Sequence, residues 1–242
     1  MIILEYIEGI ILKKLNYKES SKIIYLYTDK GLISVLIHGN NKMKSPFLSL
    51  SKVLSKVGLH VSGKDLRTLR DGDVLDDYRN ISSDLEKYTY SLHVLEIIYY
   101  FSTHEHDHEK LYSFLLKIFS IVDTTEQYIP YLNMIELKLL YMLGINPMFH
   151  HCVECDRTDN LKFSVPAGGM CCNTHLTGQS SGSDAAIEEI MKIYYFDLSE
   201  SEILEVDNAL LKEIRLVIDK YYQYHLNFKS NSRKMLMGLI GY

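Results

Sequence analysis

All four cysteines of this 242-residue chain lie in one short stretch, HHCVECDRTDNLKFSVPAGGMCCNTH, residues 150–175. Cys152 and Cys155 are separated by two residues, and Cys172 and His175 repeat this spacing after sixteen intervening residues. Two such pairs at this separation are typical of a tetrahedral structural zinc site. Thiolate and imidazole ligands suit Zn²⁺ better than Mg²⁺ or Ca²⁺. The stretch therefore predicts a Zn²⁺ bound by these four residues.

Three other interpretations of the cysteines stay open. A redox Cys-x-x-Cys normally begins a helix beside a βαβ unit, whereas this one follows a predicted helix end and Pro147. Disulfides are rare in the cytosol, which is the compartment that we expect. The cysteines could also be structural without binding metal, and within the zinc interpretation Cys171 competes with Cys172. Four protein ligands leave no position for water, so such a metal would be structural and not catalytic.

Other polar clusters are less specific. The histidine-rich stretch STHEHDHEK, residues 102–110, is either a second metal site or a solvated loop between helices. No Gly-rich phosphate loop and no GxSxG motif is present, so an ATPase or hydrolase has little support. An acidic turn at the end of the first module is either a nuclease-type carboxylate cluster or a solvated junction: Asp71, Asp73, Asp76 and Asp77.

Positive charge is concentrated near the amino end. Residues 1–70 contain 12 Lys and Arg against 5 Asp and Glu, whereas residues 71–242 contain 14 against 26. A basic module joined to an acidic one predicts that the first meets a polyanion, the alternative being charge that merely drifts along the chain. The candidate DNA-binding residues are Lys13, Lys14, Lys22, His38, Lys42, Lys44, Arg67 and Arg70.

Tyr17, Tyr25 and Tyr27 are interleaved with these charges. Small barrels bind single strands by pairing a basic groove with aromatic platforms, and each stacked base contributes about 1–3 kcal/mol. One face of every strand must nevertheless be buried, so we expect Tyr25 or Tyr27 to belong to the core.

The elements that would position these residues change character along the chain. Short apolar runs with turn signals such as Asp29-Lys30-Gly31 fill the first 78 residues and predict a small barrel. The expected strands are Glu8–Leu15, Lys22–Thr28, Leu32–His38, Val53–Val61 and Leu66–Leu69, with a weaker one near Val74–Tyr78.

From Asp84 the apolar spacing becomes helical. We expect an α+β multi-domain chain, with a β module at 1–80 and a helical module at 81–242 that carries a cysteine-rich insertion at 150–178. The expected helices contain Leu85–Tyr99 and Leu111–Val122 and then span 126–143, 185–195 and 207–228, with a capping box at Ser199-x-x-Glu202 for a short helix.

The first residues contain Glu5 and Glu8 within an apolar stretch, which predicts a strand and not a signal peptide. No apolar run approaches the about 20 residues of a membrane span. We therefore expect a cytoplasmic protein without a membrane partner.

The chain contains the blocks EGIILKKLNYKESSKIIYLYTDKGLISVLIHGNNKMKS and LLYMLGINPMFHHCVECDRTDNLKFSVPAGGMCCNTH. Together they resemble the family of the DNA repair protein RecO. The second block is similar to the family's Gly-x2-Pro-x4-Cys-x2-Cys segment and its later Gly-Gly-x2-Cys-x2-(Cys/His). The chain departs from the family pattern at His38, Asn40 and Asn41, where basic residues are usual. The first block matches at Gly9, Tyr17, Glu19, Ser20, Thr28, Gly31, Gly39, Lys44 and Ser45.

The resemblance implies an OB-fold barrel at the amino end and a helical domain with a zinc-finger-like insertion. It also implies a non-catalytic, nucleoid-associated recombination mediator that binds single- and double-stranded DNA and anneals complementary strands. Family members act with RecR to load RecA onto DNA coated with single-strand binding protein, whose acidic, hydrophobic C-terminal tail they hold. For that tail we expect an apolar pocket, or else a solvated helix face, edged by Lys212, Arg215, Lys220, Arg233 and Lys234.

Two other classes of function stay open. A zinc- or thiol-dependent cytosolic enzyme would need an open metal position or a cysteine of low pKa. A protein-only interaction adaptor would have a barrel that binds no oligonucleotide.

Overall fold

The computed structural model forms two compact units, Met1–Thr124 with Ser230–Tyr242, and Thr125–Lys229. Among the described residues, no helix has both the length and the hydropathy that a membrane crossing requires. The structure describes residues 4–39, 47–64, 66–104, 107–199, 203–228 and 230–239.

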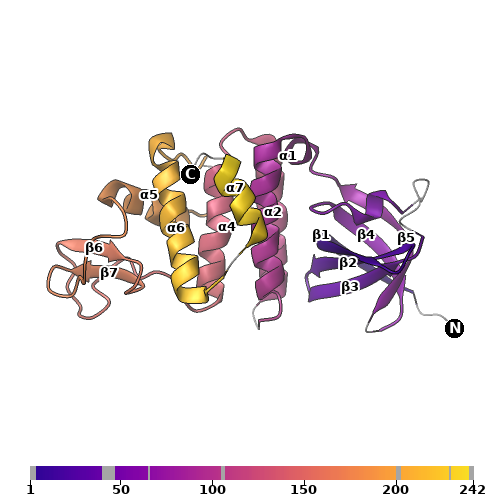
Figure 1. Ribbon diagram of the computed structural model, residues 1–242, viewed down its shortest axis with the longest axis horizontal. Helices are drawn as coiled ribbons and strands as arrows, with labels where there is room; N and C mark the ends of the chain where they lie inside the picture. Colours follow the sequence, from indigo (N-terminus) through magenta and orange to yellow (C-terminus); the bar gives the residue numbers. More distant parts are fainter. Residues whose placement is uncertain are drawn as a thin grey trace. The chain divides into compact units, whose positions relative to one another are not determined.

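Five strands of the first unit close into a barrel in the order β1-β2-β3-β5-β4 (Figure 1). Neighbouring strands pair antiparallel except β3 and β5, which run parallel. The closed five-stranded barrel confirms the predicted OB-type fold. The strands are β1 (Glu5–Tyr17), β2 (Ser21–Thr28), β3 (Gly31–Ile37), β4 (Lys56–Ser62) and β5 (Arg67–Asp76).

The barrel core follows from the alternation of side chains along each strand. In β3, every second residue of GLISVLI is buried, as a strand with one face on a core requires. The 3₁₀ turn η1 (Ser49–Ser51) adds Leu50 to this core. The other buried members are Ile7, Ile11, Ile24, Leu26, Ile33, Val35, Ile37, Val57, Leu59, Val61 and Leu69.

The last barrel strand differs from the prediction. A strand at 66–69 and a weaker one at 74–78 are one continuous strand, β5. Asp71 and Asp73 lie on this strand opposite His60 and Gly58 of β4, so the predicted acidic turn is wrong. Outward-facing carboxylates interrupt the apolar pattern of β5. The sequence pattern therefore predicted two short strands in place of one continuous strand.

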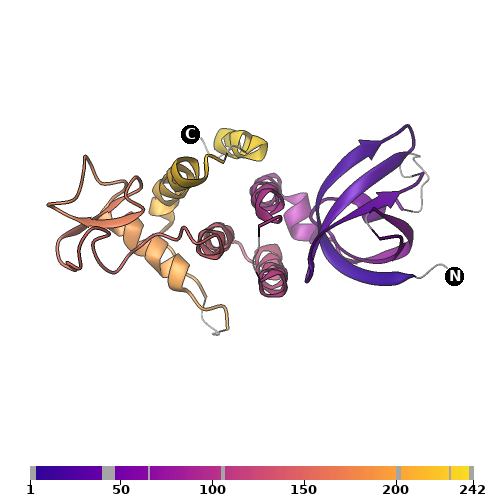
Figure 2. The same ribbon diagram turned by 90° about the horizontal axis from the view of Figure 1, so that it is seen from below.

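Four helices complete the first unit. Asp84 caps α2, because its side chain accepts a hydrogen bond from the N–H of Lys87. The C-terminal helix α7 lies beside α2 in both views (Figures 1 and 2), where Glu96 accepts hydrogen bonds from the hydroxyls of Ser230 and Ser232. No sequence pattern predicted α7. The helices are α1 (Arg79–Ser83), α2 (Leu85–Phe101), α3 (His108–Thr124) and α7 (Asn231–Leu239).

The second unit contains the remaining helices and a small hairpin. The helix predicted at 126–143 is α4, with Pro130 in its first turn as expected. The helix predicted at 207–228 begins as a 3₁₀ turn and ends at Asn227, whose φ is +47°. The capping box predicted at Ser199 extends into residues outside the described ones. The elements are α4 (Ile129–Met142), β6 (Leu161–Ser164), β7 (Gly169–Cys172), α5 (Asp184–Tyr195), η2 (Asn208–Leu210) and α6 (Leu211–Leu226).

Candidate metal centre and nucleic-acid interface

Two tight turns bring together the four side chains predicted to bind metal. In the first turn, the N–H of Cys155 donates to the carbonyl of Cys152 at 3.3 Å, and the N–H of Cys152 donates to the carbonyl of Arg157 at 2.9 Å. In the second turn, the N–H of His175 donates to the carbonyl of Cys172 at 2.9 Å. Each pair is therefore held by local backbone bonds that the two-residue spacing allows.

The ligand atoms of Cys152, Cys155, Cys172 and His175 all lie within 4.8 Å of one another. The sulfurs of Cys155 and Cys172 are 3.9 Å apart, and His175 Nδ1 lies 3.5 Å and 3.4 Å from the sulfurs of Cys152 and Cys172. A tetrahedral ion with Zn–S bonds of about 2.3 Å and Zn–N bonds of about 2.05 Å separates sulfurs by about 3.8 Å, and sulfur from nitrogen by about 3.5 Å. The donor set and its spacing therefore fit Zn²⁺.

The local electrostatics favour the thiolate form, which is the form that binds metal, at Cys152 and Cys172. At Cys155, a backbone hydrogen bond at Arg157 lowers the pKa of the thiol, but burial and the Cys152 and Cys172 side chains outweigh it and raise that pKa. Burial of the Cys152 thiol opposes its ionisation, but hydrogen bonds from the backbone at Cys172 and Glu154 and from the His175 ring bring its pKa down to about 6. Burial also opposes ionisation of Cys172, yet backbone hydrogen bonds at Thr174 and His175 lower the pKa of its thiol. The side chain of Cys152 raises the pKa of His175.

Cys171 and Cys172 are neighbours on β7, so their side chains point to opposite faces of the hairpin. Cys172 joins the ligand cluster, whereas Cys171 is buried apart from it, and burial raises the pKa of its thiol. All four cysteines are free, and the sulfur separation in the cluster is far above the about 2.05 Å of a disulfide bond. The structure thus favours Cys172 over Cys171 as the ligand and contains no disulfide.

The metal-binding segment packs on α6 of the same unit. Tyr221 donates to the carbonyl of Gly168 at 3.4 Å, and His225 Nε2 lies 2.7 Å from the carbonyl oxygen of Val165. Burial is the main cause that raises the pKa of Tyr221, which keeps its hydroxyl as a donor. The segment is therefore an integral part of the second unit, although most of it is loop.

Strand register brings basic residues to one end of the barrel. A continuous cross-strand row crosses β1, β2, β3 and β5 through Lys14, Ile24, Val35 and Arg67. Ile24 and Val35 of this row face the core, so Lys14 and Arg67 point to the same side of the sheet. Lys22 lies two residues before Ile24 on β2 and points to that side too. We call Lys14, Lys22 and Arg67 the basic end.

The cations near the basic end differ in their surroundings. Burial and the neighbouring Lys22 ammonium lower the pKa of Lys14, so the two charges lie close together. Arg67 donates through Nε to Glu5 at 3.0 Å, which partly neutralises its charge. His38 is exposed and its Nδ1 lies 3.3 Å from a serine hydroxyl at the start of β2. Lys14 and Lys22 therefore carry most of the available positive charge of the basic end.

The other predicted DNA-binding residues are placed less favourably or not described. The Lys13 ammonium lies 4.5 Å from the centroid of the Tyr99 ring on α2. Arg70 is exposed and donates through Nε to a serine hydroxyl of β4 at 2.8 Å. Lys42 and Lys44 lie outside the described residues.

The structure separates the three tyrosines of the barrel. Tyr27 is buried and its hydroxyl lies 3.0 Å from Nδ1 of His108 on α3. Tyr25 packs edge-on against Tyr99 of α2, with ring centroids 5.3 Å apart. The expectation that one of the two belongs to the core is confirmed for Tyr27. Only Tyr17, which is 38% exposed, remains as a platform for bases.

A mostly apolar, partly exposed row that faces away from the core was missed from the sequence. Leu15, Ile23, Leu36 and Thr68 are successive partners across β1, β2, β3 and β5, and they point away from the core. Leu15 is 42% exposed. The sequence signal is that one strand has apolar residues at both odd and even positions. Such a strand is normally interpreted as buried on both faces, so its outward side was not predicted to be accessible.

The structure corrects one predicted partner-binding residue. Arg215 is 2% exposed and donates to both carboxylate oxygens of Glu136 on α4, and to Asp219 at 2.6 Å. It lies between Ile214 and Ile218 in the sequence, on the face of α6 that packs inward. Arg215 therefore forms a buried ion pair between helices and cannot edge a surface pocket.

The remaining predicted partner-binding residues are divided between the two units. Lys212 and Lys220 are exposed on α6. Lys234 is exposed and Arg233 is partly exposed on α7.

The histidine-rich stretch 102–110 is only partly described. His108 begins α3 and contacts Tyr27, and His104 Nδ1 lies 3.2 Å from the carbonyl oxygen of Phe101. Within the part of the chain that the structure describes, the cysteine and histidine cluster is the one group of three or more potential metal ligands.

Comparison with known proteins covers both halves of the chain. Residues 1–78 match the family model described as Recombination protein O N terminal, and residues 82–234 match Recombination protein O C terminal. A DNA repair protein RecO of an Exiguobacterium species is 26% identical over 98% of this chain and 97% of its own length. A protein of the same name from Bacillus cereus is 27% identical over 95% of each chain.

Proposed function

This chain belongs to the RecO family, and on that premise we propose that it is a non-catalytic recombination mediator in DNA repair. It binds single- and double-stranded DNA, anneals complementary strands and, with RecR, helps to load RecA onto DNA coated with single-strand binding protein. It acts in the cytoplasm at the nucleoid. The relatives support this proposal by their names and near full-length coverage.

The observation that carries the DNA-binding proposal is the basic end, where Lys14 and Lys22 lie close together near the exposed Leu15 and Tyr17 at the end of β1. Lys14 and Lys22 neutralise phosphates, while Leu15 and Tyr17, which point to the other side of the same strand end, offer apolar surface to bases. Annealing requires only that two strands be held close with part of their charge screened. No side chain has to take part in covalent chemistry.

We propose that the metal centre is a structural Zn²⁺ site that organises the insertion at 150–178 within a helical domain at 81–242, which follows the barrel domain at 1–80. When bound, the ion would supply only a cross-link between two turns, because Cys152, Cys155, Cys172 and His175 would fill all four positions of a tetrahedral ion. This leaves a zinc-dependent hydrolase without a position for water.

The DNA-binding proposal is tested by measuring the anisotropy of a labelled single-stranded oligonucleotide against salt. Each phosphate contact on a single strand contributes about 0.7 to the slope of log affinity against log salt. The double variant Lys14→Ala/Lys22→Ala should therefore weaken binding at low salt and lower the slope by about 1.4. Lys30→Ala is the matched control, because Lys30 is exposed in the turn between β2 and β3, at the opposite end of those strands.

Two results would contradict the proposal. An unchanged slope in the double variant would place DNA elsewhere than the basic end. No binding by the unaltered protein at low salt would favour a protein-only adaptor.

For the tail of single-strand binding protein, we propose the exposed lysines of α6 or the basic residues of α7. The pairs Lys212→Ala/Lys220→Ala and Arg233→Ala/Lys234→Ala should be compared for binding of an acidic, hydrophobic tail peptide. A loss of affinity in one pair identifies the helix, and unchanged affinity in both would refute the proposal.

A further inference from the structure

The outward surface of β1, β4 and β5 has the opposite charge from the basic end. Register places Tyr6 beside His60, and His60 beside Asp71. In the next row, Glu8 and Asp73 flank a glycine of β4 on its two sides. All five side chains are exposed. We call Tyr6, Glu8, His60, Asp71 and Asp73 the acidic face.

Two rings form the centre of the acidic face. The centroids of Tyr6 and His60 are 5.1 Å apart, with their planes tilted by 49°. The Tyr6 ring lies over Gly58, since a Cβ at this position would be 2.3 Å from the tyrosine hydroxyl. The Tyr6 hydroxyl donates to Glu8 at 3.2 Å, which holds the ring against the sheet. A glycine on β4 thus allows an aromatic surface to lie flat and exposed.

The carboxylates around these rings are not fully neutralised. Glu8 forms an ion pair with Lys56 at 3.1 Å. The Asp73 carboxylate makes no hydrogen bond or ion pair with any residue that the structure describes. A face with this charge repels phosphate and attracts cations, so DNA held at the basic end would avoid it.

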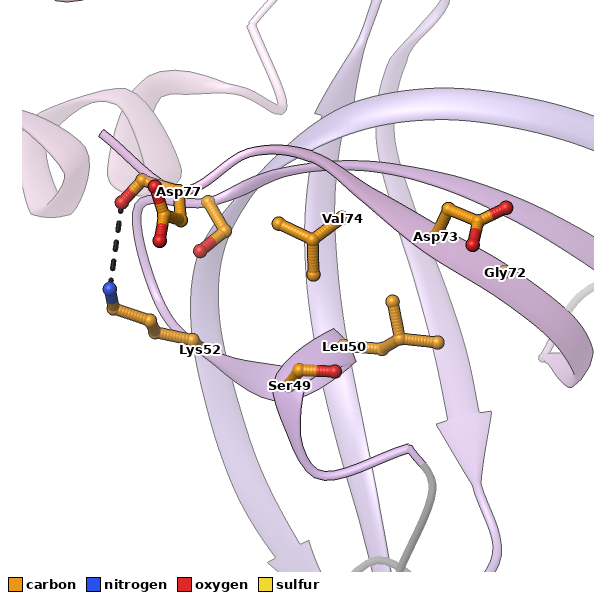
Figure 3. Close-up of a pocket in the computed structure, with 8 residues that line it drawn as sticks. Ser49, Leu50, Lys52, Gly72, Asp73, Val74 and Asp77 are labelled. Atoms are coloured by element: carbon orange, nitrogen blue, oxygen red, sulfur yellow. Dashed lines mark hydrogen bonds between the residues drawn. The ribbon is translucent and has the colours of Figure 1, made fainter. Parts of the chain in front are cut away.

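A pocket of about 510 Å³ adjoins the acidic face and shares Asp73 with it (Figure 3). Ser55 lines this pocket and is 1% exposed, yet its hydroxyl has no hydrogen-bond partner among the described residues. Lys52 lies at the end of the pocket away from Asp73, where its ammonium donates to the carbonyl oxygen of Asp77 at 3.5 Å (Figure 3). A buried hydroxyl without a partner is costly, which makes it a candidate contact for a ligand. We call this cavity the Ser55 pocket.

We propose that the acidic face and the Ser55 pocket form a docking site for a basic segment of a partner protein. One arginine or lysine side chain of that segment lies across Tyr6 and His60, with its cationic group on the outer side of the Tyr6 ring, within reach of Glu8 and Asp73. A second basic side chain enters the pocket and donates to the Ser55 hydroxyl.

Three properties of the site select this occupant. Rings flanked by carboxylates bind guanidinium and ammonium groups by cation–π attraction and charge-assisted hydrogen bonds. The site extends over three strands, which suits an extended polypeptide better than a compact ion. Its charge excludes nucleic acid.

The test uses the full chain and a fluorescein-labelled peptide of alternating Arg and Ser, at about 0.15 M salt so that long-range attraction is screened. Asp73→Asn should weaken peptide binding about fivefold to tenfold. Tyr6→Leu should weaken it about twofold to fivefold, and Ser55→Ala should also weaken it. The matched control Glu205→Gln removes one exposed carboxylate from the other unit and should leave affinity unchanged. A peptide with citrulline in place of Arg should not bind.

Equal effects of Asp73→Asn and Glu205→Gln would refute the site, because they would indicate general attraction to an acidic protein. Displacement of the peptide by an equal concentration of spermidine would show a site for free polyamines instead. Self-association that Asp73→Asn abolishes, without peptide binding, would show that a second copy covers the face. None of the variants should lower the temperature of thermal unfolding. Binding of single-stranded DNA should persist in Asp73→Asn, so failure here is distinguishable from failure of the proposed function.

Discussion

Replacement of the buried Arg215 by Met should destabilise the second unit strongly. The side chain is 2% exposed and contacts Glu136, Asp219 and, at 3.3 Å, Asn133. Glu136 is 0% exposed and Asp219 is 3% exposed. Methionine fills similar space but leaves both carboxylates without their cation.

The expected magnitude follows from the desolvation of the remaining charges. Removing one partner of a buried ion pair costs about 3–5 kcal/mol, a large fraction of the about 5–15 kcal/mol that stabilises a typical domain. Burial without a counter-ion raises the pKa of the Glu136 carboxyl in the variant. The folded variant would then bind a proton that the unfolded chain releases at neutral pH, so the loss should be larger at pH 8 than near pH 5.5.

The assay is urea unfolding, combined with hydrogen exchange of the α4 and α6 amides, which reports on the second unit. Lys220→Met on the same helix is the matched control, because Lys220 is exposed and its loss should change the free energy of unfolding by less than about 0.5 kcal/mol. The triple variant Glu136→Leu/Arg215→Met/Asp219→Leu should recover most of the stability, since well-packed apolar residues can replace a buried ion pair.

A loss in Arg215→Met no larger than that in Lys220→Met would refute the assignment of Arg215 to a buried ion pair. Arg215 would then be an exposed candidate for partner binding, as the sequence predicted. An equal loss of unfolding free energy at pH 5.5 and pH 8 would contradict the expected uptake of a proton by Glu136 in the folded variant.

Further changes test the metal centre, the hairpin and the pocket. Cys172→Ser should abolish stoichiometric zinc while Cys171→Ser retains it, as measured by metal analysis of protein purified without chelator. Zinc affinity should fall as the pH is lowered, because every ligand must lose its proton to bind: the Cys155 thiol and the His175 ring, whose pKa values are raised, compete for protons first, and the Cys152 thiol, whose pKa is about 6, adds a further loss below about pH 6; a chromophoric chelator measures the release. Gly169→Ala should destabilise the second unit by more than about 2 kcal/mol in urea unfolding, because its Cβ would lie 2.4 Å from a main-chain oxygen. Ser55→Ala should leave the melting temperature unchanged or raise it, since its hydroxyl has no partner to lose; a clear fall would contradict the account of the pocket.

Local patterns account for what sequence reasoning predicted well. Each pair of metal ligands lies within one turn, so the two-residue spacing alone places Cys152 near Cys155 and Cys172 near His175. The first three strands and the helix ends near Pro130 follow from periodicity and turn residues within a few positions. The basic character of the first module is likewise a property of composition.

The tertiary structure decided everything that depends on which face of an element is covered. Arg215 and Lys220 belong to one helix, yet packing against α4 buries only Arg215. Cys171 and Cys172 are adjacent, and the hairpin determines which of them meets the other ligands.

In the barrel, strand register determines which charged side chains become neighbours. It gathers Lys14, Lys22 and Arg67 at one end, and it places Asp71 and Asp73 beside Tyr6 and His60 on another face. The physical reason is that side-chain direction within an element follows from local geometry, whereas burial and charge neighbourhood depend on contacts between residues distant in the chain. The sequence by itself therefore determined the types of chemistry present in this protein, and the register and packing determined where each of them is available.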